Sequence, residues 1–185
     1  MSLGSDSKRK FRTAAKQALL ALALPVIATS DIQTTTQTIS ANVSPYGKLS
    51  LPASVTLRSA NARFGGALSG SLTVSYWART SEAGGGSVTV QASSGFSPAG
   101  GPSIGDVTYF CSGATLGAGC SGNQNLTTST QTPAVSLPAG VCTGGGSTCS
   151  AQEPNSVLLT LSAPNRPQYK TGTYSAQITF TISTL

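Results

Sequence analysis

The sequence predicts an all-β protein built as an antiparallel β-sandwich, and three observations support this fold class. Short segments of alternating apolar and polar residues recur along the chain, Gly- and Pro-rich stretches separate them, and nothing after residue 30 shows the 3.6-residue apolar repeat of an amphipathic helix. Alternation with a period of two is typical of a half-buried strand, because successive side chains point to opposite faces. Several such strands without intervening helices are typical of a sandwich.

The last segment, residues 173–184, gives the strongest strand signal. Its apolar or amphipathic positions alternate with Ser, Thr and Gln, and they are Tyr174, Ala176, Ile178, Phe180 and Ile182. The same pattern predicts earlier strands within residues 38–44, 54–58, 71–79, 87–93, 107–111 and 156–162.

Residues 1–28 have the three parts of a secretory signal peptide. A basic region precedes an apolar run at 18–27, and small residues then permit cleavage after Ala28 or Ser30. The run would make about 15 Å of helix, against the ~30 Å hydrocarbon core of a bilayer. We therefore expect a secreted product, in the periplasm, on the cell surface or in an extracellular fibre, without stable membrane insertion.

Removal of this leader changes the charge of the protein. Six basic and four acidic residues remain after residue 30, so the net charge falls from +6 to +2. The six cations are scattered, whereas a nucleic-acid surface needs clustered Lys and Arg. The charge pattern excludes nucleic acid as a partner.

All four cysteines, Cys111, Cys120, Cys142 and Cys149, follow the leader. An even count in an exported chain predicts disulfides, of which three pairings are conceivable. Proximity in the sequence favours Cys111–Cys120 and Cys142–Cys149, with the role of stapling surface loops. A metal site is the alternative, but the spacings are not those of close ligand pairs and the chain has no histidine.

Residues 45–185 are expected to form a single sandwich domain with a disulfide-stapled insertion at 111–150. This middle stretch has few strand formers and is rich in Gly, Ser, Thr and Asn. It is either a binding loop on a rigid scaffold or a solvated spacer. Residues 31–44 are either an N-terminal extension or the first strand.

The sequence predicts no catalytic, metal or cofactor site, and hence no enzyme. Without histidine the usual base for a Ser or Cys nucleophile is missing. The four carboxylates after the leader, Asp31, Glu82, Asp106 and Glu153, are dispersed. Trp77 lies on the opposite face of its strand from Leu72, and it is a candidate ligand contact; burial is the alternative that we favour.

The ending GTYSAQITFTI, at residues 172–182, resembles the last strand of spore coat protein U-like proteins and the related archaic chaperone–usher pilins. Residues 70–79 and 86–93 are similar to middle strands of that family. The resemblance implies an immunoglobulin-like sandwich that lacks one strand and is exported with a periplasmic chaperone and an usher. It also implies that subunits polymerise when the N-terminal segment of one fills the groove of the next.

The resemblance makes two groups of residues candidates for subunit assembly. Ile39, Ala41 and Val43 lie on one face of an extended N-terminal segment, as a donor strand requires, although Ile32 is out of phase with them. The acceptor candidates are Tyr174, Ile178, Phe180 and Ile182. We therefore expect a structural subunit of a pilus, fibre or coat, and hence a homo-oligomer. The alternative is a monomeric extracellular module that binds carbohydrate or a surface through Trp77 or the 111–149 loop region.

Overall fold

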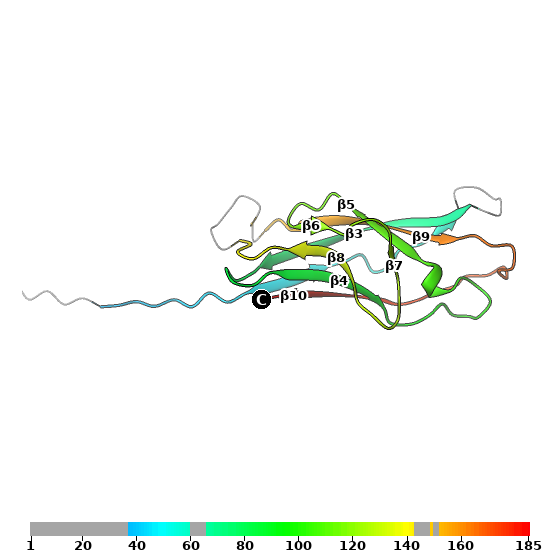
Figure 1. Cartoon of the computed structure of the whole chain (residues 1–185). Helices are drawn as coiled ribbons and strands as arrows, with labels where there is room; N and C mark the ends of the chain where they lie inside the picture. The colour runs from blue at the N-terminus through cyan, green and yellow to red at the C-terminus, as the bar shows by residue number, and fades with distance from the viewer. Residues whose placement is uncertain (1–36, 60–65, 143–148, 150–151) are drawn as a thin grey trace, which may run out of the picture. The chain divides into compact units, whose positions relative to one another are not determined.

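Two antiparallel β-sheets pack against each other in the computed structural model of the chain, which confirms the predicted fold class (Figure 1). The structure describes residues 37–59, 66–142, 149 and 152–185, so the predicted signal peptide, residues 1–28, lies outside the described residues. The chain divides into two units, residues 1–40 and residues 41–185, and both sheets belong to the second. None of the described residues forms a helix long and apolar enough to cross a membrane.

Within the described residues, ten strands form the two sheets, and all of their pairings are antiparallel. The first sheet has the order β1-β3-β9-β5-β7, with β2 also paired to β3. Its strands are β1 (Tyr46–Ser50), β2 (Arg58–Ser59), β3 (Ala67–Arg79), β5 (Thr108–Ser112), β7 (Gln124–Asn125) and β9 (Asn155–Pro164). The second sheet has the order β10-β4-β8-β6. Its strands are β4 (Gly86–Ala92), β6 (Ala118–Gly119), β8 (Thr132–Leu137) and β10 (Ile178–Thr184), and a 3-10 turn, η1 (Ile104–Asp106), precedes β5.

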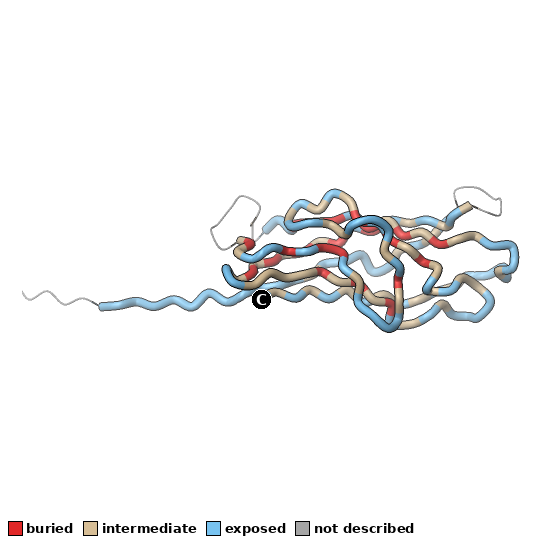
Figure 2. The backbone as a smooth tube through the Cα atoms, viewed as in Figure 1, coloured by how far each residue is buried: buried red, intermediate tan, exposed pale blue. Residues whose placement is uncertain are grey.

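The core lies between the sheets, where the alternating apolar positions of the strands meet. Val74, Tyr76, Val88 and Val157 are fully buried, and their polar neighbours in sequence face outward. Figure 2 shows this alternation of buried and less buried residues along the strands. Burial of such side chains is the main favourable term for folding, at about 25 cal/mol for each Å² of apolar surface removed from water.

The outward faces carry Ser and Thr, which pair across neighbouring strands. Ser71 Oγ lies 3.2 Å from Thr160 Oγ1 on the first sheet, and Ser87 Oγ lies 3.1 Å from Ser183 Oγ on the second. Cross-strand hydroxyl pairs of this kind each add a fraction of a kcal/mol, on the order of 0.2–1. The outer faces of these strands are therefore polar but uncharged at these positions.

Two expectations about secondary structure differ from the structure. The stretch at 111–150 contains β6, β7 and β8, and β8 lies between β4 and β6 with Ala134, Val135 and Leu137 buried, so much of it belongs to the sandwich. Residues 37–45 contain no strand, and within 51–59 only β2 is regular. Of the two alternatives for residues 31–44, the described part, 37–44, is an extension.

Candidate functional site: an apolar groove beside an unpaired edge strand

A groove of about 970 Å³ lies between the two sheets, beside β10. Its apolar walls come from the chain around β2, from the start of β3, from the loop after β4 and from β10. The main apolar side chains are Leu57, Leu68, Phe96, Ile104, Ile178 and Phe180. Each is only partly buried and packs against the core, so the groove exposes part of the sandwich interior.

β10 presents an unpaired edge to this groove, because it is the last strand of its sheet. Ser93 N–H donates to Gln177 O at 2.8 Å, and Leu185 N–H donates to Gly85 O at 2.9 Å. Hydrogen-bonded pairs alternate along an antiparallel ladder, so the odd-numbered residues between 177 and 185 face β4. The main-chain N–H and C=O groups of Ile178 and Phe180 therefore point to the other edge, where a further strand could pair.

The opposite wall is open because residues 51–57 leave the first sheet. β1 pairs with the end of β3 and β2 with its beginning, while the residues between them form no strand. Val55 and Leu57 line the groove instead. The alternation within 54–58 predicted a strand, but only Arg58 of these residues belongs to one. The alternating apolar side chains line the groove without a partner strand.

β1 ends the groove on one side. A Cβ atom on Gly47 of β1 would lie 3.2 Å from the Ile182 side chain, so the two strands are in close contact there. Ile182 is absent from the groove lining, whereas Ile178 and Phe180 are part of it. Of the predicted acceptor residues, Ile182 is therefore covered by β1.

The other end is formed by the chain just before β10. The Tyr174 ring lies against Gly101, where an added Cβ would be 2.5 Å from the ring, and its hydroxyl donates to Lys170 O at 2.6 Å. Arg166 lines the groove and forms an ion pair with Asp106 at 3.2 Å. The Tyr169 hydroxyl also belongs to a lining residue, and it is buried without a hydrogen-bond partner among the described residues.

The predicted donor residues are exposed. Ile39 is 91% exposed and Val43 is 67% exposed, and all of residues 37–46 are exposed. We call residues 37–44 the tail. Arg79, at the end of β3, donates from Nε and Nη2 to Ser44 O at 3.0 and 2.6 Å. No pattern of residue types had predicted this contact.

Trp77 is half-buried on the outer side of β3, as its phase in the strand predicted. Lys48 Nζ lies 4.6 Å from the centre of its ring, in a cation–π contact. Its Nε1 atom is buried without a hydrogen-bond partner among the described residues. Lys48 thus covers one ring face that a bound sugar would need.

Both predicted disulfides are present, at S–S distances of 2.04 Å for Cys111–Cys120 and 2.05 Å for Cys142–Cys149. The first closes the short, largely exposed connection between β5 and β6, and it also has a role that was not predicted. Cys111 belongs to β5 of the first sheet and is buried, while Cys120 directly follows β6 of the second. This disulfide therefore connects the two sheets, at an edge remote from β10 in the strand order.

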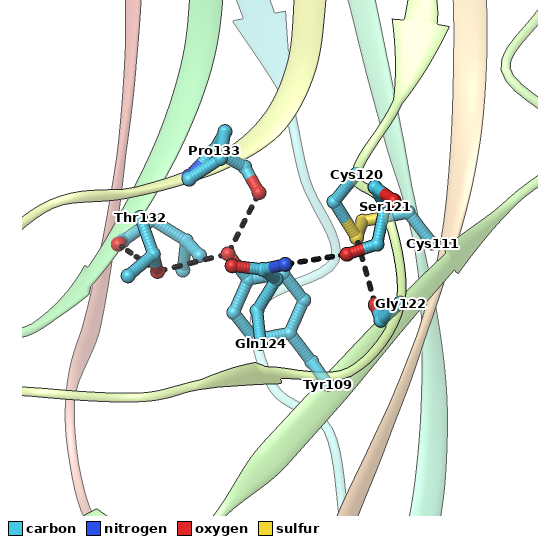
Figure 3. Close-up of a disulfide and its surroundings, with 9 residues drawn as sticks. Tyr109, Cys111, Cys120, Ser121, Gly122, Gln124, Thr132 and Pro133 are labelled. Atoms are coloured by element: carbon cyan, nitrogen blue, oxygen red, sulfur yellow. Dashed lines mark hydrogen bonds between the residues drawn. A yellow bond between two sulfur atoms is a disulfide. The ribbon is translucent and has the colours of Figure 1, made fainter.

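Tyr109 reinforces the same edge (Figure 3). Its hydroxyl lies 2.8 Å from Pro133 O, to which it donates, and 2.8 Å from Thr132 Oγ1. The Tyr76 hydroxyl likewise donates to Leu116 O. Burial raises the pKa of both tyrosines above the ordinary value of 10.0.

The described carboxylates do not form a catalytic or metal-binding group. Asp106 pairs with Arg166, Glu82 lies in the turn between β3 and β4, and Glu153 precedes β9. Among the residues that the structure covers, His, Cys, Asp and Glu nowhere gather in threes as a metal site would require. Asp31 lies outside the described residues.

No protein-family model, characterised protein or solved structure matches the chain.

Proposed function

We propose that the protein is an exported structural subunit of a fibre, pilus or coat, in which the tail of one copy fills the groove of another. The observation that carries this proposal is the apolar groove beside an unpaired strand edge in a chain that also has an exposed tail with alternating apolar residues. Addition of a strand to an open sheet edge combines main-chain hydrogen bonds with pockets for alternate side chains.

The tail and the groove agree in length and phase. Ile39, Ala41 and Val43 occupy alternate positions over five residues, which span about 13 Å as a strand. Residues 176–180, the part of the last segment that lines the groove, are also five residues long. Alternate residues of this part, Ala176, Ile178 and Phe180, are partly buried, whereas the residues between them are exposed.

The length of the chain favours a second copy as the source of the strand. β1 runs from Tyr46 to Ser50, and the groove begins at Leu51, about 17 Å from Tyr46 along the strand. Val43 is three residues from Tyr46 and can reach about 10 Å at most, even without the turn that it would need. Val43 therefore cannot enter the groove of its own subunit, so the three apolar residues of the tail cannot fill that groove together.

This function gives the remaining features a consistent role. Two disulfides favour an oxidising compartment outside the cytoplasm. The resemblance of residues 172–182 to pilin ends favours an immunoglobulin-like sandwich without its last strand. An open edge invites pairing with any free strand, so a periplasmic chaperone would cover it before an usher assembles the fibre. The subunit would act by assembly and carry no enzymatic activity.

The test is a pair of neighbouring substitutions in the tail of the mature chain. Ala41→Asp places a charge on the inward face of the donor, where burial without a partner is costly. Asn42→Asp adds the same charge on the opposite face and is the matched control. We expect size-exclusion chromatography and electron microscopy to show fibres for the wild type and for Asn42→Asp, and monomers for Ala41→Asp. A monomeric wild type, or fibres unaffected by Ala41→Asp, would contradict the proposal.

A carbohydrate-binding module centred on Trp77 is the second candidate. The half-buried indole with its unpaired Nε1 favours it, and the Lys48 side chain over the ring opposes it. A glycan array with the wild type and Trp77→Ala tests this candidate. Binding that Trp77→Ala removes, with unchanged assembly, would support it, and the absence of any glycan signal would dismiss it.

A further inference from the structure

The junction between the tail and the sandwich is held by Arg79. Two donors of one guanidinium converge on the carbonyl oxygen of Ser44, at 3.0 and 2.6 Å. Arg79 is itself fixed at the end of β3, where it pairs with Tyr46, the first residue of β1. The contact therefore connects the last tail residue to β3, an interior strand of the first sheet that lies between β1 and β9.

The sequence restricts the same junction further. Pro45 follows Ser44, so the φ angle of residue 45 is fixed near −65°. The proline ring also keeps the residue before it out of the helical region, which leaves Ser44 extended. The Arg79 guanidinium and the Pro45 ring thus constrain two consecutive residues, Ser44 and Pro45. The two hydrogen bonds from Arg79 have a charged donor, and such bonds are stronger than those between neutral groups.

We propose that Arg79 is a positioning residue for assembly, because it fixes the direction in which the tail leaves the subunit. The inference rests on the proposed function. If Ile39–Val43 lies in the groove of a second copy, Ser44 and Pro45 are the two residues that connect this donor strand to β1 of its own sandwich. With Ser44 held by Arg79, the connection is short and stiff, so consecutive subunits keep one relative orientation.

In the part of the chain that the structure describes, no other cation contacts Ser44. Lys48 lies over Trp77, and Arg166 pairs with Asp106 at the far end of the groove. Arg58 is exposed on β2, at the opposite end of β3 from Arg79. Arg58 therefore offers a matched control with the same side chain, the same sheet and no contact with Ser44.

The first experiment compares fibres of Arg79→Gln, Arg79→Lys and Arg58→Gln by electron microscopy. We expect all three to assemble, because the donor residues are unchanged. The persistence length of Arg79→Gln fibres should fall by about twofold or more, since an unclamped connection behaves as a flexible linker. Arg79→Lys should be intermediate and Arg58→Gln equal to the wild type.

The melting temperature of each unassembled subunit, in the Ala41→Asp background, separates positioning from stability. Equal melting temperatures with softer Arg79→Gln fibres support the proposal. Fibres of Arg79→Gln as stiff as the wild type overturn it. If Arg79→Gln does not fold, the comparison of Arg79→Lys with Arg58→Gln decides in the same way.

The second experiment lengthens the connection. An insertion of about twelve Gly and Ser residues between Ser44 and Pro45 has a root-mean-square span of about 19 Å, enough for the tail to return to the groove of its own subunit. We expect closed monomers in place of fibres. Stiff fibres from the insertion variant would overturn the inference that the short junction directs the tail outward. Failure of the proposed function is recognised separately, by fibres that Ala41→Asp leaves unchanged.

Discussion

The two edges of the sandwich are constructed differently, although both consist of short alternating segments. At the closed edge, the Cys111–Cys120 disulfide and the hydrogen bond from Tyr109 to Pro133 O cross between the sheets. Leu137 of β8 is almost fully buried there, at 3% exposure. At the open edge, Ile178 and Phe180 of β10 remain partly exposed in the groove, and the 51–57 segment opposite them forms no strand.

The difference between the two edges lies in how the strands at each edge are protected from pairing with other chains. Natural sheets protect their edges by short strands, bulges or covering segments. β6 and β7, with two residues each, are short edge strands of this kind at the closed edge. β10 has seven residues in strand conformation, and its first three, Ile178 to Phe180, lie uncovered along the groove. Stability resides at the closed edge, whereas the open edge has the geometry of a binding site.

The largest expected effect comes from truncating one apolar side chain at each edge. Leu137→Ala should lower the free energy of unfolding by about 3 kcal/mol, because it leaves a cavity in a closed core. Ile178→Ala should cost about 1 kcal/mol in the unassembled subunit, since that side chain is already partly exposed. Urea unfolding of both variants in the Ala41→Asp background measures the difference. Equal losses would mean that the two edges are equally well packed.

The two disulfides sharpen the comparison. Replacing Cys111 and Cys120 by Ala should lower the free energy of unfolding by about 2–3 kcal/mol. The loops closed by the two disulfides are similar, with sequence separations of 9 and 7, so chain entropy alone predicts similar losses. We expect a smaller loss for Cys142→Ala with Cys149→Ala, because only the first disulfide joins the two sheets. Equal losses would show that the cross-sheet position adds nothing.

The smallest effect should appear at alkaline pH. Burial raises the pKa of Tyr76 and Tyr109 above 10.0, so the folded state holds these protons more tightly than the unfolded chain. Their contribution to stability is complete below pH 10.0 and is lost as the pH rises from there through the folded-state pKa. Urea midpoints at about pH 8 and about pH 11 should show this loss, with a smaller loss for Tyr109→Phe. A Tyr109→Phe variant with an undiminished alkaline loss would contradict the assignment.

Much of the sandwich could be predicted from alternation alone. The buried faces of β3, β4 and β9, and the half-buried face of β10, follow the apolar phase of their sequences. β8 was placed in an insertion because its strand formers, residues 134–137, are a short run within a stretch rich in Gly, Ser, Thr and Asn. Its role depends on pairing with β4, which is distant in the sequence and leaves no local signal.

The candidate site was only half predictable. Ile178 and Phe180 were identified from the end of the chain, and both line the groove. Leu57, Leu68 and Phe96 also line the groove, but they were not identified as site residues. They line it because no strand covers their side chains, and the alternation of residues in one sequence does not show which strands lack a partner. The Arg79–Ser44 contact joins residues 35 positions apart through one side chain, which no pattern of residue types indicates.

The paired hydroxyls on the outer faces would have a consequence for fibres assembled as proposed. The pairs Ser87–Ser183 and Ser71–Thr160 expose neutral groups to water, and salt does not screen the interactions of neutral groups. If the proposed filaments form, such flanks would repel one another weakly, so the filaments should gather into hydrated bundles. The thickness of these bundles should then change little between fresh water and brine.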